Sequence, residues 1–401
     1  MEKQESAFLK TDSRARDSKE GYNISTSGVK IMASMPVEDQ GCSSESRDSE
    51  SDHERPGYRI CSYVERFIDT DAGPIPVVTT ALGRRDLLST FAVRCGVNRH
   101  NYTVTPGLYA VGEPDKTSEV LVTSNFKLTF DHLRKELAGV SAWILVLDTR
   151  GINVWCAASK GTFSTAELVK RIQASSLEKI VDHKRVVVPQ LGATGVAARE
   201  VKNRSGFRVV YGPIRARDIR SFLRNDKKAD KEMRQVSFTM YERFILTPVE
   251  IQMMLKPALV TVLLLFVISG FGPGIFSVAG SWQRGMASVI ALAAGIVSGA
   301  FVTPVLLPFI PSKIFALKGI ITGAILSVPV LALVQSSASG AAGLAALWLF
   351  SVTVSSYTAM NFTGATPFTS PSGVEKEMKR FIPVQSVCIL ISLGVWIYSA
   401  F

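Results

Sequence analysis

The segment with the clearest chemical potential runs from Asn153 to Phe163 and has Cys156 near its start. A cysteine thiolate is a soft nucleophile and a good metal ligand, so this residue could bind an electrophilic centre. The next three side chains are small and would let a flat, bulky ligand approach the backbone. The alternative is a buried structural cysteine, which is common in protein cores, and spacing alone favours that alternative.

Alternating strands and helices are predicted around this segment, between residues 57 and 225. Runs rich in Val and Ile predict strands, and amphipathic stretches predict helices between them. This order indicates an α/β fold with a Rossmann-like parallel sheet covered on both faces. Ligands of such folds bind at the carboxyl ends of the strands. The predicted strands are 120–123, 142–148, 185–189 and 208–211, the helices 128–137, 165–175 and 217–223, and the candidate ligand loops 148–160, 190–195 and 212–213.

Other residue types offer weaker signals. Gly192, Gly195 and Gly212 could bring the backbone close to a ligand, although the residues alone favour ordinary turn glycines. The five cysteines form no CxxC pair, so neither an iron–sulfur cluster nor a zinc site is expected from this chain alone. No phosphate loop and no Asp-x-His-x-x-Gly motif is present. The four histidines are predicted to be surface or loop residues rather than metal ligands, and they are His53, His100, His132 and His183.

The C-terminal part of the chain has a membrane-like composition. No charged side chain occurs from Gly319 to Val374, and a soluble surface needs interspersed charge. Five apolar stretches approach the ~20 residues that a transmembrane helix needs, and they lie near 257–276, 286–308, 314–334, 340–358 and 382–400. The sequence therefore predicts a disordered tail at 1–56, an α/β domain at 57–226, a basic linker at 227–254 and a domain of five transmembrane helices at 255–401.

The distribution of Lys and Arg predicts the orientation of these helices. Cations precede the first stretch, join the second and third at Lys313 and Lys318, and join the fourth and fifth, whereas the alternate side has only Arg284. By the positive-inside rule, the α/β domain faces the cytoplasm from the inner membrane of a multi-pass protein. Lys318 is expected to snorkel towards the interface. The net charge of +11 then reflects topology and lipid contact, and nucleic-acid binding is not expected.

The cysteine segment resembles the cap-helix signature of the corrinoid protein of microbial mercury methylation. The family's usual form is Asn-Val/Ile-Trp-Cys-Ala-Ala/Ser-Gly-Lys, from which residues 153–160 depart at Ser159. A second departure is Ser164, where glycine is usual. The α/β part is also similar to the corrinoid-binding domain in the large subunit of the corrinoid iron–sulfur protein of acetyl-CoA synthesis, which lacks the Trp-Cys motif. The likeness extends to the segments 105–112, 120–123, 127–131, 160–163, 190–196, 211–213, 360–364 and 372–378 and to the five apolar stretches.

This resemblance implies a cobalamin-type corrinoid, with Cys156 as the lower axial ligand to its cobalt. It implies transfer of a methyl group from cobalt to Hg(II), giving methylmercury. Because Hg(II) is an electrophile, the methyl group must leave with electron density, and a donating thiolate favours that departure. The implied cofactor-binding residues are Asn153, Val154, Trp155, Cys156, Ala157, Ala158, Thr162, Leu191, Gly192, Tyr211 and Gly212.

The same resemblance implies partners that this chain does not contain. A ferredoxin with two [4Fe–4S] clusters would donate electrons, and a methyl-folate-linked system would donate the methyl group. If Ser159 replaces a glycine that is needed for close approach or positive φ, the pocket would be reshaped. Two rival functions stay open: a corrinoid methyl carrier of one-carbon metabolism with a non-mercury acceptor, and a membrane transporter with a cytoplasmic regulatory domain. The scarcity of ionisable residues in the apolar stretches argues against an ion pathway.

Overall fold

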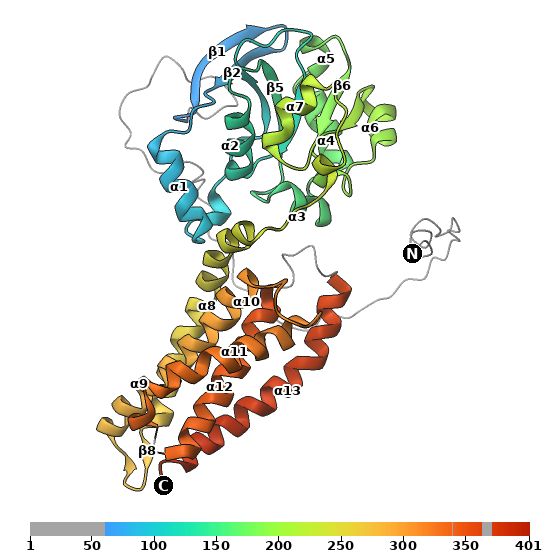
Figure 1. Cartoon of the computed structure of the whole chain (residues 1–401). Coiled ribbons are helices and arrows are strands. Elements are labelled where there is room, and N and C mark those ends of the chain that lie inside the picture. The colour runs from blue at the N-terminus through green and yellow to red at the C-terminus, as the bar shows by residue number, and fades with distance from the viewer. Residues whose placement is uncertain (1–60, 339, 363–370) are drawn as a thin grey trace, which may run out of the picture. The chain divides into compact units, whose positions relative to one another are not determined.

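The computed structural model describes residues 61–338, 340–362 and 371–401 (Figure 1). The tail predicted at residues 1–56 lies outside these ranges. An α/β region comes first in the described chain, and a helical region follows it. The strands are β1 (Val64–Thr70), β2 (Gly73–Val78), β3 (Gly107–Val111), β4 (Val120–Ser124), β5 (Ala142–Leu147), β6 (Arg185–Val188), β7 (Arg208–Tyr211), β8 (Phe271–Gly272) and β9 (Ile275–Phe276). The helices of the α/β region are α1 (Arg84–Arg94), α2 (Lys127–Glu136), α3 (Val154–Ser159), α4 (Thr165–Ala174), α5 (Leu177–Ile180), α6 (Ala198–Ser205) and α7 (Ile219–Arg224).

The central sheet of the described α/β region has seven strands in the order β1-β2-β3-β5-β4-β6-β7. Strands β5, β4, β6 and β7 are parallel, which confirms the four strands predicted from the apolar runs. The sheet is mixed rather than wholly parallel, because β3 runs antiparallel to β5 and β1 pairs antiparallel with β2. The carboxyl ends of β4, β6 and β7 therefore share one edge of the sheet.

Apolar cores cover both faces of this sheet, as predicted. One core combines alternate sheet residues such as Val122 and Leu145 with Phe163, Leu168 and Ile172 from the α3–α4 side. The core on the other face is formed by the remaining sheet residues with Phe130 and Leu133 of α2, its C-cap Leu137, and Ile219 and Phe222 of α7. Because side chains along a strand alternate between faces, the continuous apolar strands supply both cores at once.

A buried ionic network ties α1 to α2. Lys127 Nζ lies 2.8 Å from Asp86 Oδ1 and 2.7 Å from Asp131 Oδ2. Arg134 closes the network, with Nη2 2.8 Å from Asp86 Oδ2 and Nε 2.8 Å from Asp131 Oδ1. Its Nη1 also donates to the Thr79 carbonyl at 2.7 Å. Two cations and two carboxylates thus balance one another, which is what makes charge tolerable in a protein interior.

The helical region contains α8 (Met240–Ser269), α9 (Val278–Ile296), a π-helical segment (Val297–Val302), α10 (Thr303–Val305), α11 (Phe315–Ala332), α12 (Gly340–Asn361) and α13 (Pro371–Tyr398). Among the described residues, five helices are long and apolar enough to cross a membrane, counting α9 through α10 as one. They correspond to the five predicted apolar stretches. Helix α8 begins at Met240, inside the stretch that the sequence suggested as a linker.

Small residues let these helices approach closely. A Cβ on Gly295 of α9 would lie 2.7 Å from the Ser351 carbonyl of α12, and one on Gly319 of α11 would lie 2.5 Å from the Ser355 carbonyl. Lys318 behaves differently from the prediction. It is buried and donates from Nζ to the carbonyls of Leu307 and Ile310, so it caps the chain between α10 and α11 instead of snorkelling.

Candidate functional site

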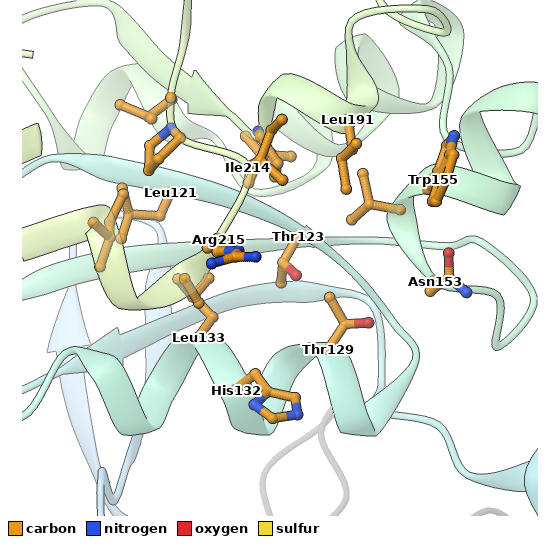
Figure 2. Close-up of a pocket in the computed structure, with 18 residues that line it drawn as sticks. Leu121, Thr123, Thr129, His132, Leu133, Asn153, Trp155, Leu191, Ile214 and Arg215 are labelled. Atoms are coloured by element: carbon orange, nitrogen blue, oxygen red, sulfur yellow. The ribbon is translucent and has the colours of Figure 1, made fainter. Parts of the chain in front are cut away.

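A cavity of about 350 Å³ opens at the carboxyl ends of β4, β6 and β7, between α2 and α3 (Figure 2). Its walls are mostly apolar, with a few polar groups among them. This position is where α/β folds place their ligands. The lining residues are Leu121, Val122, Thr123, Thr129, His132, Leu133, Asn153, Val154, Trp155, Val187, Pro189, Leu191, Gly212, Pro213, Ile214, Arg215, Ala216 and Ile219.

The helix α3 forms one wall of the cavity, and its first turn is fixed by capping. Asn153 is the N-cap, and its Oδ1 accepts a hydrogen bond from the Cys156 backbone N–H at 3.0 Å. Asn153, Val154 and Trp155 line the cavity. The capping places Cys156 one turn into the helix, where its thiol is free and exposed. The cysteine is therefore available at the surface next to the cavity, and the buried structural alternative does not hold.

The loop before α3 is held by a residue that sequence reasoning missed. Asn125 directly follows β4, and its buried Oδ1 accepts from the Thr149 N–H at 3.0 Å, the Thr149 hydroxyl at 2.8 Å and the Gly151 N–H at 3.0 Å. The Thr149 hydroxyl also lies 2.6 Å from the Ile152 carbonyl, so its single proton is shared between two acceptors. The Asn125 side-chain amide therefore holds the loop at 149–152, which leads into α3. A polar residue at the carboxyl end of a predicted strand was the available signal.

The glycine loop after β6 supports α3 from beneath. A Cβ on Gly195 would lie 2.1 Å from the Phe163 carbonyl and 3.2 Å from the Ala158 Cα. A Cβ on Gly192 would lie 2.5 Å from the Phe163 ring. These two glycines therefore permit close packing of the loop against Phe163 and the end of α3. The sequence had left two roles open for them, a ligand cradle and an ordinary turn. Ala158 is buried in this contact, so its small size serves the packing, and its neighbour Ala157 is buried in the core below.

The two departures from the cap-helix signature fit the local geometry. Ser159 is the last residue of α3 and does not have positive φ, so a glycine is not required there for its backbone freedom. Its hydroxyl donates back to the Trp155 carbonyl at 3.3 Å. Ser164 is the N-cap of α4, and its Oγ accepts from the Glu167 N–H at 3.3 Å. Serine is a favoured N-cap residue, so this departure stabilises the next helix.

The opposite wall comes from α2 and from the loop after β7. Thr129 and His132 of α2 line the cavity, and Arg215 enters from the loop after β7 (Figure 2). Desolvation and the nearby Arg94 guanidinium lower the pKa of His132 below its usual value, which favours the neutral ring. The Arg94 Nη2 lies 3.2 Å from His132 Nε2. Thr129, His132 and Arg215 were not among the site residues predicted from the sequence.

Arg215 is the cationic group of the cavity wall. Its Nη2 lies 2.7 Å from Glu242 Oε1, in the first turn of α8. Both side chains are only partly exposed, so the pair is shielded but reachable. The segment Gly212–Pro213 was predicted as a ligand loop, and Arg215 follows it by two residues. The ligand pocket is thereby joined to the start of the helical region.

The predicted cofactor-binding residues fall into two groups. Five of them line the cavity: Asn153, Val154, Trp155, Leu191 and Gly212. The other six do not line it. Cys156 is exposed. Ala157 and Ala158 are on the buried side of α3, and Gly192 is buried in the loop after β6. Thr162 donates to the Ala157 carbonyl at 3.4 Å, and Tyr211 donates from its hydroxyl to the Val196 carbonyl at 2.6 Å. Among the described residues, no group of three or more His, Cys, Asp or Glu side chains is arranged to hold a metal ion.

Comparison with known proteins identifies relatives of the α/β region. Residues 78–223 match a family model described as the CO dehydrogenase/acetyl-CoA synthase delta subunit. The acetyl-CoA decarbonylase/synthase complex subunit gamma of Methanopyrus kandleri is 35% identical over 131 residues, which is 32% of this chain and 28% of the relative. The protein of the same name from Archaeoglobus fulgidus is 31% identical over 122 residues, covering 30% of this chain and 26% of the relative.

A third relative is the subunit gamma 2 of Methanosarcina thermophila, 37% identical over 114 residues, covering 27% of this chain and 23% of the relative. The chain thus spans about a quarter of the length of these relatives. The matched region, residues 78–223, includes α3 and all of the residues that line the cavity. The α/β region is therefore similar to subunits of an enzyme complex of acetyl-CoA synthesis and breakdown.

Proposed function

We propose that the α/β region binds a corrinoid at the cavity edge of the sheet, with Cys156 as the lower axial ligand to cobalt, and that Hg(II) is the methyl acceptor. The observation that carries this proposal is the free, exposed thiol on α3 next to a preformed apolar cavity. A thiolate is a metal ligand, and a cysteine exposed at a ligand-binding edge has no packing role to explain it.

The residues present fit such a cofactor. The cavity of about 350 Å³ is too small for a whole corrin macrocycle, but it suits a side arm of one. The thiol lies outside the cavity, on the exposed surface of α3, where a macrocycle has room. Arg215 supplies a guanidinium, which binds phosphate well, and a corrinoid nucleotide tail carries a phosphodiester. The apolar walls and this cation together match a large ligand with a charged arm.

When bound, a corrinoid supplies the cobalt that carries and releases the methyl group. The chain's own residues then bind and orient the cofactor. Cys156 would hold the cobalt through its sulfur and supply electron density to it, and Asn153 holds the Cys156 backbone through the N-cap hydrogen bond of 3.0 Å. Trp155, which is 36% exposed, lies at the cavity wall and limits water there. A strongly donating ligand favours departure of the methyl group towards an electrophile.

The proposal includes a membrane location and external partners. The five long apolar helices and the Lys and Arg pattern support an inner-membrane protein with its α/β region in the cytoplasm. A ferredoxin with two [4Fe–4S] clusters as electron donor and a methyl-folate-linked methyl source complete the proposed cycle. Both partners are inferred from the resemblance of the cap-helix segment to the mercury-methylation family.

Isotopically labelled Hg(II), supplied to cells that make the full chain, tests the acceptor. We expect labelled methylmercury from the wild type and loss of at least about 90% of it in Cys156→Ala, if the thiolate supplies about 1.4 kcal/mol or more to the transfer. Cys95→Ala is the matched control, because Cys95 is another described free cysteine and lies outside the cavity. Equal methylmercury output from the wild type and Cys156→Ala would contradict the ligand role.

A second candidate is a corrinoid methyl carrier of one-carbon metabolism with a non-mercury acceptor. The relatives favour it, because their names refer to acetyl-CoA decarbonylase/synthase. Purified full chain in lipid nanodiscs, loaded with 14C-methylcobalamin, separates the two candidates. Release of labelled methylmercury on addition of Hg(II) supports the first. Retention of label with Hg(II), but transfer to a purified acetyl-CoA synthase subunit, supports the second.

A further inference from the structure

The helix α1 turns its large apolar side chains outward. Leu87 is 56% exposed, and Leu88 and Phe91 are each 70% exposed. The buried positions of the helix are instead Asp86 and Val93. A surface helix of a soluble region normally buries its apolar stripe and exposes its charges. The polarity of α1 is therefore reversed at these positions, and something other than water is expected to cover the exposed face.

The rotation of α1 that exposes this face is fixed by the ionic network. Asp86 Oδ1 lies 2.8 Å from Lys127 Nζ, and Asp86 Oδ2 lies 2.8 Å from Arg134 Nη2. Asp86 Oδ2 also accepts from the Gly83 N–H at the helix start, at 3.2 Å. Turning the leucines inward would pull Asp86 out of these pairs and leave buried cations unpartnered, which is costly. The ionic network therefore holds the apolar face of α1 outward.

The residue just past the C-terminal end of α1 lies against α8. A Cβ placed on Gly96 would be 2.6 Å from Gln252 Oε1. Gln252 is one helical turn, about 6 Å, before Lys256 along α8, and no charged residue follows Lys256 until Arg284. The uncharged part of α8 is also largely unburied within the protein, with Leu259 and Leu263 more than 60% exposed. The C-terminal end of α1 therefore lies near the level where α8 becomes apolar.

The charges on α1 point to a negatively charged surface. Arg84 and Arg85 occupy the first turn, where cations oppose the helix dipole and do not stabilise the helix. Both are exposed. The acidic residue of α1, Asp86, is engaged inward, so the outward side combines apolar side chains with cations. An amphipathic helix of this composition suits the interface of a bilayer that contains anionic lipid.

We propose that α1 is an interfacial helix, which inserts Leu87, Leu88 and Phe91 among the headgroups of an anionic bilayer beside the start of α8. This inference rests on the proposed membrane location of the helical region. It adds a second attachment of the α/β region to the bilayer. Because α1 is joined to α2 by the ionic network, the attachment would hold the cavity wall that carries Thr129 and His132 close to the lipid surface.

Depth-dependent quenching by brominated lipids tests this inference on the full chain. Phe91→Trp is introduced, and the protein is reconstituted in vesicles of three parts phosphatidylcholine to one part phosphatidylglycerol. The five native tryptophans give the background, which the wild type measures. Leu263→Trp, on the apolar part of α8, is the reference for membrane insertion. Arg204→Trp, at an exposed position of α6, is the reference for water.

The added fluorescence of Phe91→Trp should be quenched at least about twofold more by lipids brominated near the headgroup than that of Arg204→Trp. Leu263→Trp should be quenched best by lipids brominated deeper in the chains. Quenching of Leu263→Trp without quenching of Phe91→Trp would overturn the interfacial helix and leave the membrane location standing. Failure of both would overturn the membrane location as well.

The charge of the lipid is tested in the same system. Replacing phosphatidylglycerol by phosphatidylcholine, or combining Phe91→Trp with Arg84→Gln and Arg85→Gln, should reduce the headgroup quenching. If another protein segment covered α1 instead, Phe91→Trp would be shielded equally from acrylamide in detergent and in vesicles, and lipid charge would have no effect. That result would overturn the proposal.

Discussion

The two regions of this chain bury charge in different ways. In the α/β region, Lys127 and Arg134 are each paired with Asp86 and Asp131 at 2.7–2.8 Å. In the helical region, the buried cations bind backbone carbonyls instead. Arg243 donates to the Val305 carbonyl at 3.0 and 3.1 Å, and Arg284 donates to the Trp396 carbonyl. Lys318 donates to the Ile310 carbonyl at 2.9 Å.

The difference follows from what each region can offer a cation. The α/β region has carboxylates, whereas from Ile251 to Phe401 the acidic residues are Glu375 and Glu377. Carbonyls at helix C-terminal ends have no partner within the helix and carry the negative end of the helix dipole. A cation at such a position gives its N–H donors to these carbonyls, so the donors and the unpaired carbonyls both gain hydrogen bonds. Charge pairs therefore fix helix rotation in the α/β region, and single cations close helix ends in the helical region.

The largest effect is expected from breaking the ionic network. Asp131→Ala leaves Lys127 and Arg134 with half of their carboxylate contacts in a site where Asp131 is 1% exposed. Removing one partner of a buried charge network costs about 3–5 kcal/mol. Thermal unfolding of the full chain in nanodiscs, monitored by amide hydrogen exchange of β4 and α2, should show this loss of stability.

Glu200→Ala is the matched control for that variant. Glu200 forms a pair with Arg204 at 3.1 Å, but both side chains are about half exposed. Surface pairs contribute about 0–1 kcal/mol, so unfolding should hardly change. Similar losses for Asp131→Ala and Glu200→Ala would show that the network is not what stabilises the α1–α2 contact.

The network also predicts a pH dependence. Burial raises the pKa of Asp86, but hydrogen bonds and charge from Lys127 and Arg134 outweigh burial and hold the pKa below its usual value. A lowered pKa in the folded state contributes stability that is present above the unfolded pKa of about 4 and is lost as pH falls through the folded pKa. The midpoint temperature of unfolding should therefore decrease as the pH is lowered below about 4. In Asp86→Asn this decrease should be smaller. A variant curve parallel to the wild type would exclude Asp86 as the titrating group.

A smaller effect is expected for a single cation of the helical region. Arg284 is buried, donates to the Ser399 hydroxyl at 3.0 Å and lies 4.3 Å from the centroid of the Trp396 ring. Arg284→Met removes these contacts and should cost about 1–3 kcal/mol. Amide exchange at the C-terminal end of α13 should accelerate about tenfold or more. Arg380→Met, at an exposed position, should leave exchange unchanged.

The smallest effect is expected at a neutral cap. Ser164→Ala removes the hydroxyl that accepts from the Glu167 N–H, and losing an N-cap side chain costs about 1 kcal/mol. Ser164→Gly should cost less, because glycine is itself tolerated at N-caps. Thermal unfolding separates the two variants. A Ser164→Gly variant more stable than the wild type would show that the serine is a harmful departure from the cap-helix signature.

Local patterns predicted much of this architecture. The strands β4 to β7 and the five apolar helices follow from periodicity and composition, which act over neighbouring residues. The hairpin β1–β2 and the antiparallel placement of β3 were not predicted, because strand pairing depends on residues far apart in the sequence. The residues of the site likewise fall into those that a local segment predicts and those that only the fold brings together. Its α3 wall is one continuous segment, whereas Thr129, His132 and Arg215 are brought together only by the fold.

The absorption spectrum of the purified full chain in nanodiscs, reconstituted with a cobalamin-type corrinoid, tests the central claim most directly. Wild type, Cys156→Ala and the Cys95→Ala control are compared after unbound corrinoid is removed. We expect all three to retain the corrinoid through the cavity, and the spectrum of Cys156→Ala alone to shift because the thiolate ligand is lost. Identical spectra for the wild type and Cys156→Ala, or no retained corrinoid in any of the three, would contradict the assignment of Cys156 as the cobalt ligand.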